Sequence, residues 1–458
     1  MSSLWKNDKK APSPVESPSK SNKHVITISR SEIAERTRGL VSSFLIAQSQ
    51  SSLKLRVLEL CNHFAEYPSS RILAVEDKRF MNTLHRYLRK LDDESVKGCI
   101  RQCLSVMGYV GSPKGCGVRI LAIDGGGTRG MMGLEVLQSL EESLGGLKIC
   151  EVFDHIVGVS TGAIIAALLT VKKLSISECK DIYYNTSREL FNQGRISGVS
   201  GLLISHSYYD TKKWIEMLKK LTGEETLLDT CQCGKTPKLG LVSCIVNAPG
   251  LIPYVFRNYE HPPGCDSHIR GGCKHPIWQA LQASAAAPGY FKEVAIGSVL
   301  HQDGGVLVNN PTGLAVHEAR MLWPDEKLQC VISVGNGRTV TELEATDVRM
   351  STSIQDKLLR IVDSATDTEL VHLSMNDLLP RNSYFRFNPY MSFPYSLDEI
   401  DPTKLAQMCR DAQLYIRRNK AKFAAAAEIL LAPPSTTQIL HRKFQNFLYH
   451  SGYFTQFV

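Results

Sequence analysis

The stretch Ile156-Val157-Gly158-Val159-Ser160-Thr161-Gly162-Ala163 joins an apolar strand pattern to a run of small and apolar residues. Its central pentapeptide, 158–162, places a serine between two glycines, as in a nucleophile elbow. Such an elbow turns sharply from strand to helix, and bulky neighbours would block both the turn and the approach of a substrate. The same residues also fit a plain turn in which Ser160 caps the helix, so the pentapeptide alone leaves both interpretations open.

A second glycine-rich segment, Asp124-Gly125-Gly126-Gly127-Thr128-Arg129-Gly130, lies one strand–helix unit upstream. Its spacing satisfies the GxGxxG fingerprint of dinucleotide-binding loops, which also requires an acidic residue at the end of the next strand. Glu141 and Glu142 come too early and fall in the predicted helix at 131–143, whereas the next strand ends at Ser160. The backbone N–H groups of this segment therefore favour an oxyanion hole, with a nucleotide site and a plain tight turn as alternatives.

Composition limits the class of protein. The 458-residue chain is 43% hydrophobic and 21% charged, as soluble globular proteins are. Its net charge of +8 favours an anionic partner, but no basic segment with interleaved aromatic residues indicates nucleic acid. The 13 cysteines and the lack of a secretory pattern predict reduced thiols in an intracellular compartment. No apolar run predicts a membrane-spanning helix, so we expect any membrane contact to be peripheral.

Four regions follow one another along the chain. Residues 1–28 are rich in Ser, Lys and Pro and are predicted to be disordered. Residues 29–110 show helical periodicity and predict a small, repeat-like α-helical module. From 116 to 340, strand and helix patterns alternate, which predicts an α/β layer fold with later strands at 238–246, 254–256 and 329–334. Residues 341–458 are expected to form a C-terminal helical region, with one long helix at 403–431 and another at 436–449.

A serine nucleophile needs a base. In an ordinary α/β-hydrolase an acid and then a histidine follow the serine. The candidate histidines occupy unremarkable segments, and we expect each to be structural or exposed: His261, His275, His301, His317 and His372. By contrast, Gln302-Asp303-Gly304-Gly305 follows an apolar segment, and its glycines leave the carboxylate open to a partner. A β-turn that begins at Asp303 is the plain alternative.

Taken in order, the segments 124–130, 158–162 and 303–305 resemble the patatin-like phospholipase family. The resemblance runs from about residue 118 to beyond 335, with Gly335-Asn336-Gly337 standing where the family more often has Gly-Thr-Gly. Further segments are similar to the animal calcium-independent phospholipase A2 branch, and most to its gamma type: 256–259, 283–291 and 309–311. The resemblance implies a patatin-like core at 116–340, with a central, mostly parallel sheet flanked by helices and an N-terminal α-helical extension.

The resemblance also implies a chemistry and a place for it. Ser160 would attack a fatty acyl ester of a glycerophospholipid, and Asp303 would accept its proton, giving free fatty acid and lysophospholipid without calcium or a cofactor. The N–H groups of Gly125, Gly126 and Gly127 would form the oxyanion hole. Arg129 would steady this loop or a lipid phosphate, unless it is simply an exposed first-turn arginine. The enzyme would act at an intracellular membrane, of the endoplasmic reticulum, mitochondrion or peroxisome, although no clear targeting signal is present.

Two other functions use the same residues. A neutral-lipid hydrolase or a lipid acyltransferase would need the same Ser–Asp dyad. A non-enzymatic module would bind a nucleotide through the GxGxxG segment. Product analysis distinguishes a neutral-lipid hydrolase or acyltransferase from a phospholipase. Labelling with a fluorophosphonate distinguishes a serine hydrolase from a nucleotide-binding module.

Two further groups of residues carry expectations. Histidines and cysteines crowd the loop at 261–275, but their spacing matches no recognised zinc-ligand pair, so we expect a lid-like loop with incidental thiols and no metal site. Basic residues that would contact an anionic bilayer are candidates at four positions: Lys172, Lys173, Arg257 and Lys292.

Overall fold

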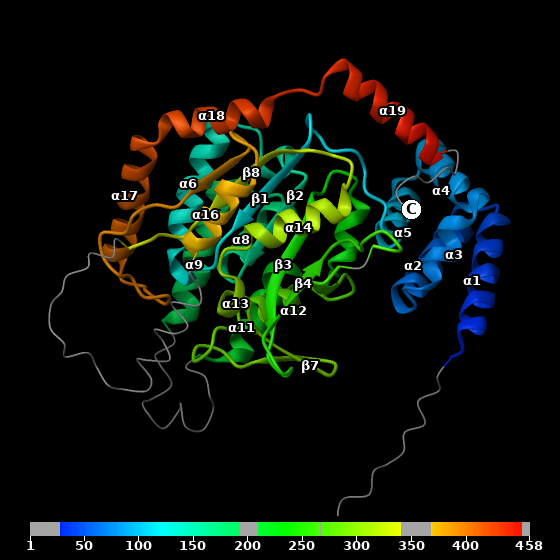
Figure 1. The fold of residues 1–458 in the computed structure, drawn as a ribbon. Coiled ribbons are helices and arrows are strands. Elements are labelled where there is room, and N and C mark those ends of the chain that lie inside the picture. The colour runs from blue at the N-terminus through cyan, green and yellow to red at the C-terminus, as the bar shows by residue number, and fades with distance from the viewer. Residues whose placement is uncertain (1–27, 193–208, 266, 340–367, 451–458) are drawn as a thin grey trace, which may run out of the picture.

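One nine-stranded sheet forms the centre of the molecule (Figure 1). The computed structural model describes residues 28–192, 209–265, 267–339 and 368–450. Five neighbouring strands run parallel, in the spatial order β3 (Lys238–Ile245), β2 (His155–Val159), β1 (Val118–Ile123), β8 (Leu328–Val334) and β9 (Tyr384–Phe387). Beyond β3 the sheet continues through four shorter or antiparallel members: β4 (Ile252–Arg257), β5 (Arg270–Gly272), β6 (Val294–Ile296) and β7 (Val299–Asp303). The predicted α/β class with a mostly parallel sheet is confirmed.

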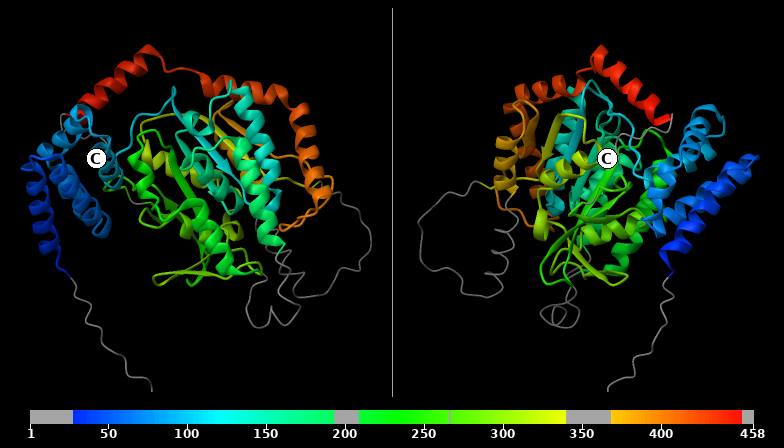
Figure 2. Two further views of the ribbon diagram at one scale, coloured as in Figure 1. Left: turned by 180° about the vertical axis from the view of Figure 1, so that it is seen from behind. Right: turned by 45° about the vertical axis from the view of Figure 1, so that its right-hand side comes forward.

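Helices cover both faces of the sheet because its central strands are apolar on both sides. β1 and β2 are buried along their whole length, as parallel strands between two helical layers are. Side chains of β1 alternate, so that Leu121 and Ile123 pack in one core and Ile120 and Ala122 in the other. Figures 1 and 2 show these two layers from opposite sides.

The two layers differ in size. The larger core is packed by α6 (Gly130–Ser143), α8 (Thr161–Thr170), α9 (Ile176–Phe191), α11 (Thr211–Thr222), α12 (Ile277–Ser284) and α18 (Lys420–Leu431). The opposite face is covered by α14 (Thr312–Leu322) and α16 (Thr368–Leu378). Short helices complete the connections: η1 (Gly127–Arg129), α7 (Ile149–Val152), η2 (Leu228–Gln232) and α13 (Gly305–Val308).

Five helices at the N-terminus pack beside the sheet domain (Figure 1), around a hydrophobic core that also includes Leu228 and Cys273 of that domain. They are α1 (Arg30–Leu45), α2 (Gln50–Glu66), α3 (Ser70–Glu76), α4 (Lys78–Lys90) and α5 (Glu94–Val106). α5 lies against η2, where Gln102 Nε2 donates to Asp229 Oδ1 at 3.0 Å and Arg101 Nη1 donates to the Gln232 carbonyl at 3.0 Å. Polar contacts as well as apolar packing therefore join these helices to the sheet domain. Of the expected disordered tail, residues 1–27 lie outside the described residues.

The prediction of one long helix at 403–431 is wrong. The segment divides into α17 (Pro402–Arg418) and α18, because Asn419 leaves helical geometry at φ −115° and ψ 18°. Its side-chain amide donates to the Tyr415 carbonyl at 2.8 Å, which ends α17. The bend allows α18 to pack on β8 and α6. α19 (Thr436–His450) then runs back over the molecule to α4, as both views in Figure 2 show.

The connection from β2 to α8 has room only for glycine at two positions. A Cβ atom at Gly158 would lie 2.2 Å from the Gly162 carbonyl oxygen, and one at Gly162 would lie 2.2 Å from the Ile123 carbonyl oxygen. Both contacts are with backbone, which cannot rotate away as a side chain can. The first turn of α8 is therefore pressed against the ends of β1 and β2.

We expect Gly162→Ala to destabilise the fold by about 1–3 kcal/mol or more, because the added methyl group overlaps the β1 backbone. Thermal unfolding followed by circular dichroism measures the effect. Gly313→Ala is the matched control, because nothing lies within 4 Å of its Cβ position in α14, and alanine there adds up to about 1 kcal/mol of stability. Equal melting temperatures for the two variants would contradict the packing described for the elbow.

Candidate active site

The sheet topology brings together the three motifs that are separate in the sequence. β1 and β2 are parallel neighbours, with Ile123 paired to Gly158, so Asp124 and Ser160 leave the sheet side by side. Carboxyl ends of adjacent parallel strands are where α/β proteins place their ligands. β7 pairs antiparallel with β3, with Asp303 opposite Ser243, and this pairing carries the Asp-Gly-Gly segment to the same edge.

Ser160 has the strained backbone of a nucleophile elbow. Its φ is 54° and its ψ is −121°, and a positive φ is uncommon for a residue with a Cβ atom. Its N–H donates to Ser284 Oγ at 2.9 Å, and Ser284 Oγ donates in turn to the Val242 carbonyl at 2.5 Å. The hydroxyl of Ser160 donates to Asp303 Oδ2 at 2.5 Å. Ser160 therefore touches a carboxylate directly, without a histidine between them.

Asp303 is buried, with 5% of its surface exposed, and its other oxygen, Oδ1, accepts the Gly305 N–H at 2.7 Å. Burial raises the pKa of this carboxyl to about 6, although the hydrogen bonds from Ser160 and Gly305 act in the opposite direction. The carboxylate is therefore ionised at neutral pH but is a stronger base than an exposed aspartate. A pKa closer to the working pH suits a general base.

The glycine loop lies over the elbow. The Gly125 N–H donates to the Asn309 carbonyl at 3.2 Å, so this predicted oxyanion donor already has an acceptor. Gly127 has a φ of 55°, and a Cβ atom there would lie 2.1 Å from the Leu397 carbonyl oxygen, so only glycine fits. Arg129 Nε donates to the Gly126 carbonyl at 3.1 Å. Arg129 is therefore bonded to the glycine loop, and its role in the loop or toward a lipid phosphate stays a prediction.

None of the five candidate histidines contacts the serine or the aspartate within the described parts of the chain. His301 Nδ1 lies 2.9 Å from Ser243 Oγ, and burial lowers the pKa of His301 to about 4. Three others bond hydroxyl groups elsewhere: His275 to Tyr254, His317 to Ser267 and His372 to Tyr384. His261 Nε2 lies 3.1 Å from Glu318 Oε2 in a buried ionic cluster. The histidines therefore have structural partners.

The cysteine- and histidine-rich loop is described at residues 261–265 and 267–275. Among the described residues, which omit 266, no group of three or more His, Cys, Asp or Glu side chains is arranged to hold a metal ion. Cys273 is buried, and burial raises the pKa of its thiol well above the ordinary value. His275 instead packs edge-on against Phe256. These side chains belong to the packing of the loop.

One of the four basic residues expected at a membrane is wrongly assigned. Arg257 is 3% exposed, because it pairs with the fully buried Glu318 at 3.1 Å. Lys172 and Lys292 are exposed. Lys173 is half-buried, and its ammonium group lies 2.8 Å from Cys233 Sγ.

The family follows from comparison with known proteins. Residues 121–316 match the family model described as patatin-like phospholipase. They belong to the patatin-like phospholipase family. The chain is 42% identical over 413 residues to calcium-independent phospholipase A2-gamma of Homo sapiens, an alignment that covers 90% of this chain and 52% of that protein. The resemblance to the gamma type is thereby confirmed.

Two less similar relatives are also phospholipases by name. Phospholipase A I of Arabidopsis thaliana is 30% identical over 371 residues, covering 69% of this chain and 28% of that protein. The 85/88 kDa calcium-independent phospholipase A2 of Mus musculus is 27% identical over 351 residues, covering 69% of this patatin-like chain and 40% of its relative. The chain spans about half the length of the gamma-type proteins that it matches.

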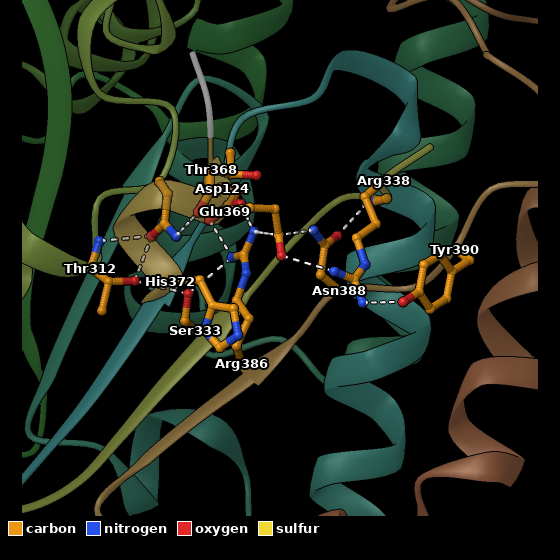
Figure 3. Close-up of polar contacts among 12 residues, drawn as sticks. Asp124, Thr312, Ser333, Arg338, Thr368, Glu369, His372, Arg386, Asn388 and Tyr390 are labelled. Atoms are coloured by element: carbon orange, nitrogen blue, oxygen red, sulfur yellow. Dashed lines mark hydrogen bonds and ion pairs between the residues drawn. The ribbon is translucent and has the colours of Figure 1, made fainter. Parts of the chain in front are cut away.

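Several residues around the site were not singled out from the sequence. Ser284 and Asn309 lie in segments that carry the family resemblance, yet nothing local indicates that they bond the elbow and the glycine loop. Arg386 is farther still, 262 positions from the Asp124 carboxylate to which it donates (Figure 3). No local sequence signal links two residues so far apart.

We expect Ser284→Ala to lower stability by about 1–3 kcal/mol, because the strained elbow loses the acceptor for its N–H group. Thermal unfolding is again the measurement. Ser143→Ala is the control, because its hydroxyl bonds only the Ser139 carbonyl within α6, and its effect should stay within about 0.5 kcal/mol. A loss for Ser284→Ala no larger than that of the control would show that this hydrogen bond does not support the elbow.

Proposed function

We propose that this protein is a calcium-independent phospholipase that hydrolyses fatty acyl esters of glycerophospholipids through a Ser160–Asp303 dyad. The observation that carries the proposal is the 2.5 Å hydrogen bond from Ser160 Oγ to Asp303 Oδ2 at a strand–helix elbow. Membership of the patatin-like phospholipase family and similarity to calcium-independent phospholipase A2-gamma support the substrate class.

The proposed chemistry has two halves. Ser160 Oγ forms a bond to the ester carbonyl carbon while its proton passes to Asp303 Oδ2. The tetrahedral intermediate collapses, the bond to the glycerol oxygen breaks, and Asp303 returns the proton to that oxygen, releasing lysophospholipid. Water then gives a proton to Asp303 and attacks the acyl-enzyme. The bond between the acyl carbon and Ser160 Oγ then breaks, Asp303 returns the proton to Oγ, and the fatty acid leaves.

The negatively charged oxygen of each tetrahedral intermediate needs hydrogen-bond donors. We propose that the N–H groups of Gly126 and Gly127 supply them, because the Gly125 N–H is bonded to Asn309. The N-terminus of α8, which begins directly after Ser160, adds a favourable dipole. Loss of one such donor costs about 2.7–4 kcal/mol of transition-state stabilisation in better-studied hydrolases. A dyad with an aspartate base relies on these donors heavily.

We also propose that the enzyme works at the surface of an intracellular membrane. None of the helices in the described ranges is long and apolar enough to cross a bilayer. α16 instead presents large apolar side chains to solvent, with Leu370 64% and Leu373 57% exposed. The carbonyl of Thr368, at the start of this helix, accepts from Asn310 Nδ2 at 3.0 Å, close to the Asp303 segment. An apolar surface beside the site suits lipid that enters from a bilayer.

We expect Ser160→Ala to abolish both fluorophosphonate labelling and release of fatty acid from phosphatidylcholine vesicles, because the nucleophile is lost. Asp303→Asn should lower turnover by at least about 10³-fold without unfolding the protein, because the amide cannot accept the proton. Gel fluorescence reports labelling, and mass spectrometry reports the lipid products.

The control is Ser298→Ala, at an exposed serine in the turn between β6 and β7, which should match the unaltered chain in both assays. Strong labelling of Ser160→Ala, or full activity of Asp303→Asn, would refute the dyad. Faster hydrolysis of triacylglycerol than of phosphatidylcholine would assign the site to neutral lipid instead.

We expect kcat/KM to fall about tenfold per pH unit below pH 6, because protonation of Asp303 removes the base.

The contribution of Asp303 to folding stability changes with pH in the opposite direction from activity. Its folded-state pKa is raised above 3.8, so the contribution is full below about pH 4 and is lost as the pH rises through about 6. Loss of activity on acidification therefore should not reflect unfolding at this group. The measurement is the pH–rate profile with a soluble ester, alongside melting temperatures at each pH. An activity that stays constant down to pH 4.5 would exclude Asp303 as the base.

A further inference from the structure

A buried ion pair holds Asp124, the first residue of the glycine loop (Figure 3). The guanidinium group of Arg386 meets the carboxylate of Asp124 with both nitrogens, Nη1 at 2.9 Å from Oδ1 and Nη2 at 2.6 Å from Oδ2. Both side chains are 2% exposed. Burial raises the pKa of Asp124 to about 6 against the lowering effect of Arg386, so the pair is ionic at neutral pH. A fork-to-fork contact of this kind fixes direction as well as distance.

The pair crosses one strand of the sheet. Arg386 of β9 is paired in register with Ser333 of β8, and Ser333 is paired with Ala122 of β1, two residues before Asp124. The Arg386 side chain passes Ser333, whose hydroxyl accepts from Nη1 at 2.9 Å, and reaches the end of β1. Two strands, β1 and β8, lie between β9 and β2, the strand that leads into the elbow, yet Arg386 of β9 contacts the first residue of the loop.

The other polar groups of Asp124 are also held. Its N–H donates to the Val334 carbonyl at 2.9 Å, and its carbonyl accepts from Asn336 Nδ2 at 2.6 Å. The next N–H, that of Gly125, is bonded to Asn309. Asp124 and the Gly125 N–H group are therefore all held by hydrogen bonds. Gly126 and Gly127 are the next residues of the loop.

A second layer of contacts supports Arg386 from outside (Figure 3). Glu369 of α16 lies 3.6 Å from Nη2 of Arg386 and accepts from Asn388 Nδ2 at 2.9 Å. On the inner side, Ser333 Oγ lies 2.8 Å from Thr312 Oγ1 at the start of α14. The guanidinium group is thus fixed between α16 and the sheet.

We propose that Arg386 is a positioning residue for the reaction: by clamping Asp124, it aims the backbone donors of the glycine loop at the oxyanion that forms over Ser160. The inference rests on the proposed function. A misaligned donor weakens binding of the charged intermediate more than binding of the neutral ester, so the clamp acts on kcat rather than on KM.

The test compares two equally buried arginine–carboxylate pairs. Arg386→Gln breaks the clamp, and Arg257→Gln breaks the Arg257–Glu318 pair, whose side chains are 4% and 0% exposed at the opposite edge of the sheet. Both variants should melt at lower temperature, because each removes the guanidinium group that is paired with a buried carboxylate. The readouts are kcat and KM for 4-nitrophenyl butyrate, the rate of fluorophosphonate labelling, and the melting temperature.

We expect Arg386→Gln to lower kcat and the labelling rate about 10–100-fold, less than complete loss of a donor, with KM within about twofold. Arg386→Lys keeps the charge but not the two-pronged hydrogen bonding, so its kcat should lie between that of the unaltered chain and that of Arg386→Gln. Arg257→Gln should retain kcat within about twofold per folded molecule, because a stability defect alone does not change the chemistry. Asp124→Asn removes the other buried carboxylate. Its residual activity should still fall at low pH, since Asp303 is the proposed base.

A folded Arg386→Gln with the same kcat as Arg257→Gln would overturn the proposal. If Arg386→Gln does not fold, Arg386→Lys and Ser333→Ala decide: unchanged kcat in both overturns the proposal, and a loss of more than about threefold in either supports it. Failure of the proposed function would look different, because the unaltered chain itself would then show neither labelling nor ester hydrolysis.

Discussion

The pairing of Ile123 with Gly158 sets the glycine loop and the elbow side by side, and the close contact of α8 with the β1 backbone keeps them there. A side chain at Gly162 would push α8 away from the sheet, and with it the strained Ser160. The geometry of the candidate site is therefore a consequence of how tightly one helix approaches two strands. Apolar burial on both faces of β1 and β2 supplies the stability that a strained serine requires.

Two buried carboxylates near the elbow have opposite environments. Asp124 is paired with a guanidinium group, whereas Asp303 receives only an O–H and an N–H group, with no cation paired to it in the described part of the chain. Burial raises the pKa of both carboxyls to about 6, but of the two only Asp303 accepts the Ser160 hydroxyl, as the proposed base must. The one that is clamped by Arg386 is suited to holding the loop in place. The two aspartates thus contact different groups: Asp124 a guanidinium group, and Asp303 a hydroxyl and a backbone N–H group.

Much of the architecture could be predicted because it depends on local pattern. The strands at 238–246 and 329–334 were predicted from apolar runs, and the structure has them at Lys238–Ile245 and Leu328–Val334. The break at Asn419 was missed, because a helical pattern continues on both sides of it and nothing local signals that α18 packs on β8 and α6. Arg257 was expected at the surface because its buried partner, Glu318, is 61 residues away and no local pattern links the two.

The sequence by itself determined the α/β class, the family, and two residue types: a serine between glycines and an aspartate followed by two glycines. These depend on short-range rules of turn geometry and periodicity, which a single chain segment displays. Only the tertiary structure decided that Ser160 bonds Asp303, that the Gly125 N–H is already occupied, and that Arg386 holds Asp124. Each of those contacts joins residues on different strands or loops. Strand order and register, which bring such residues together, are properties of the whole sheet.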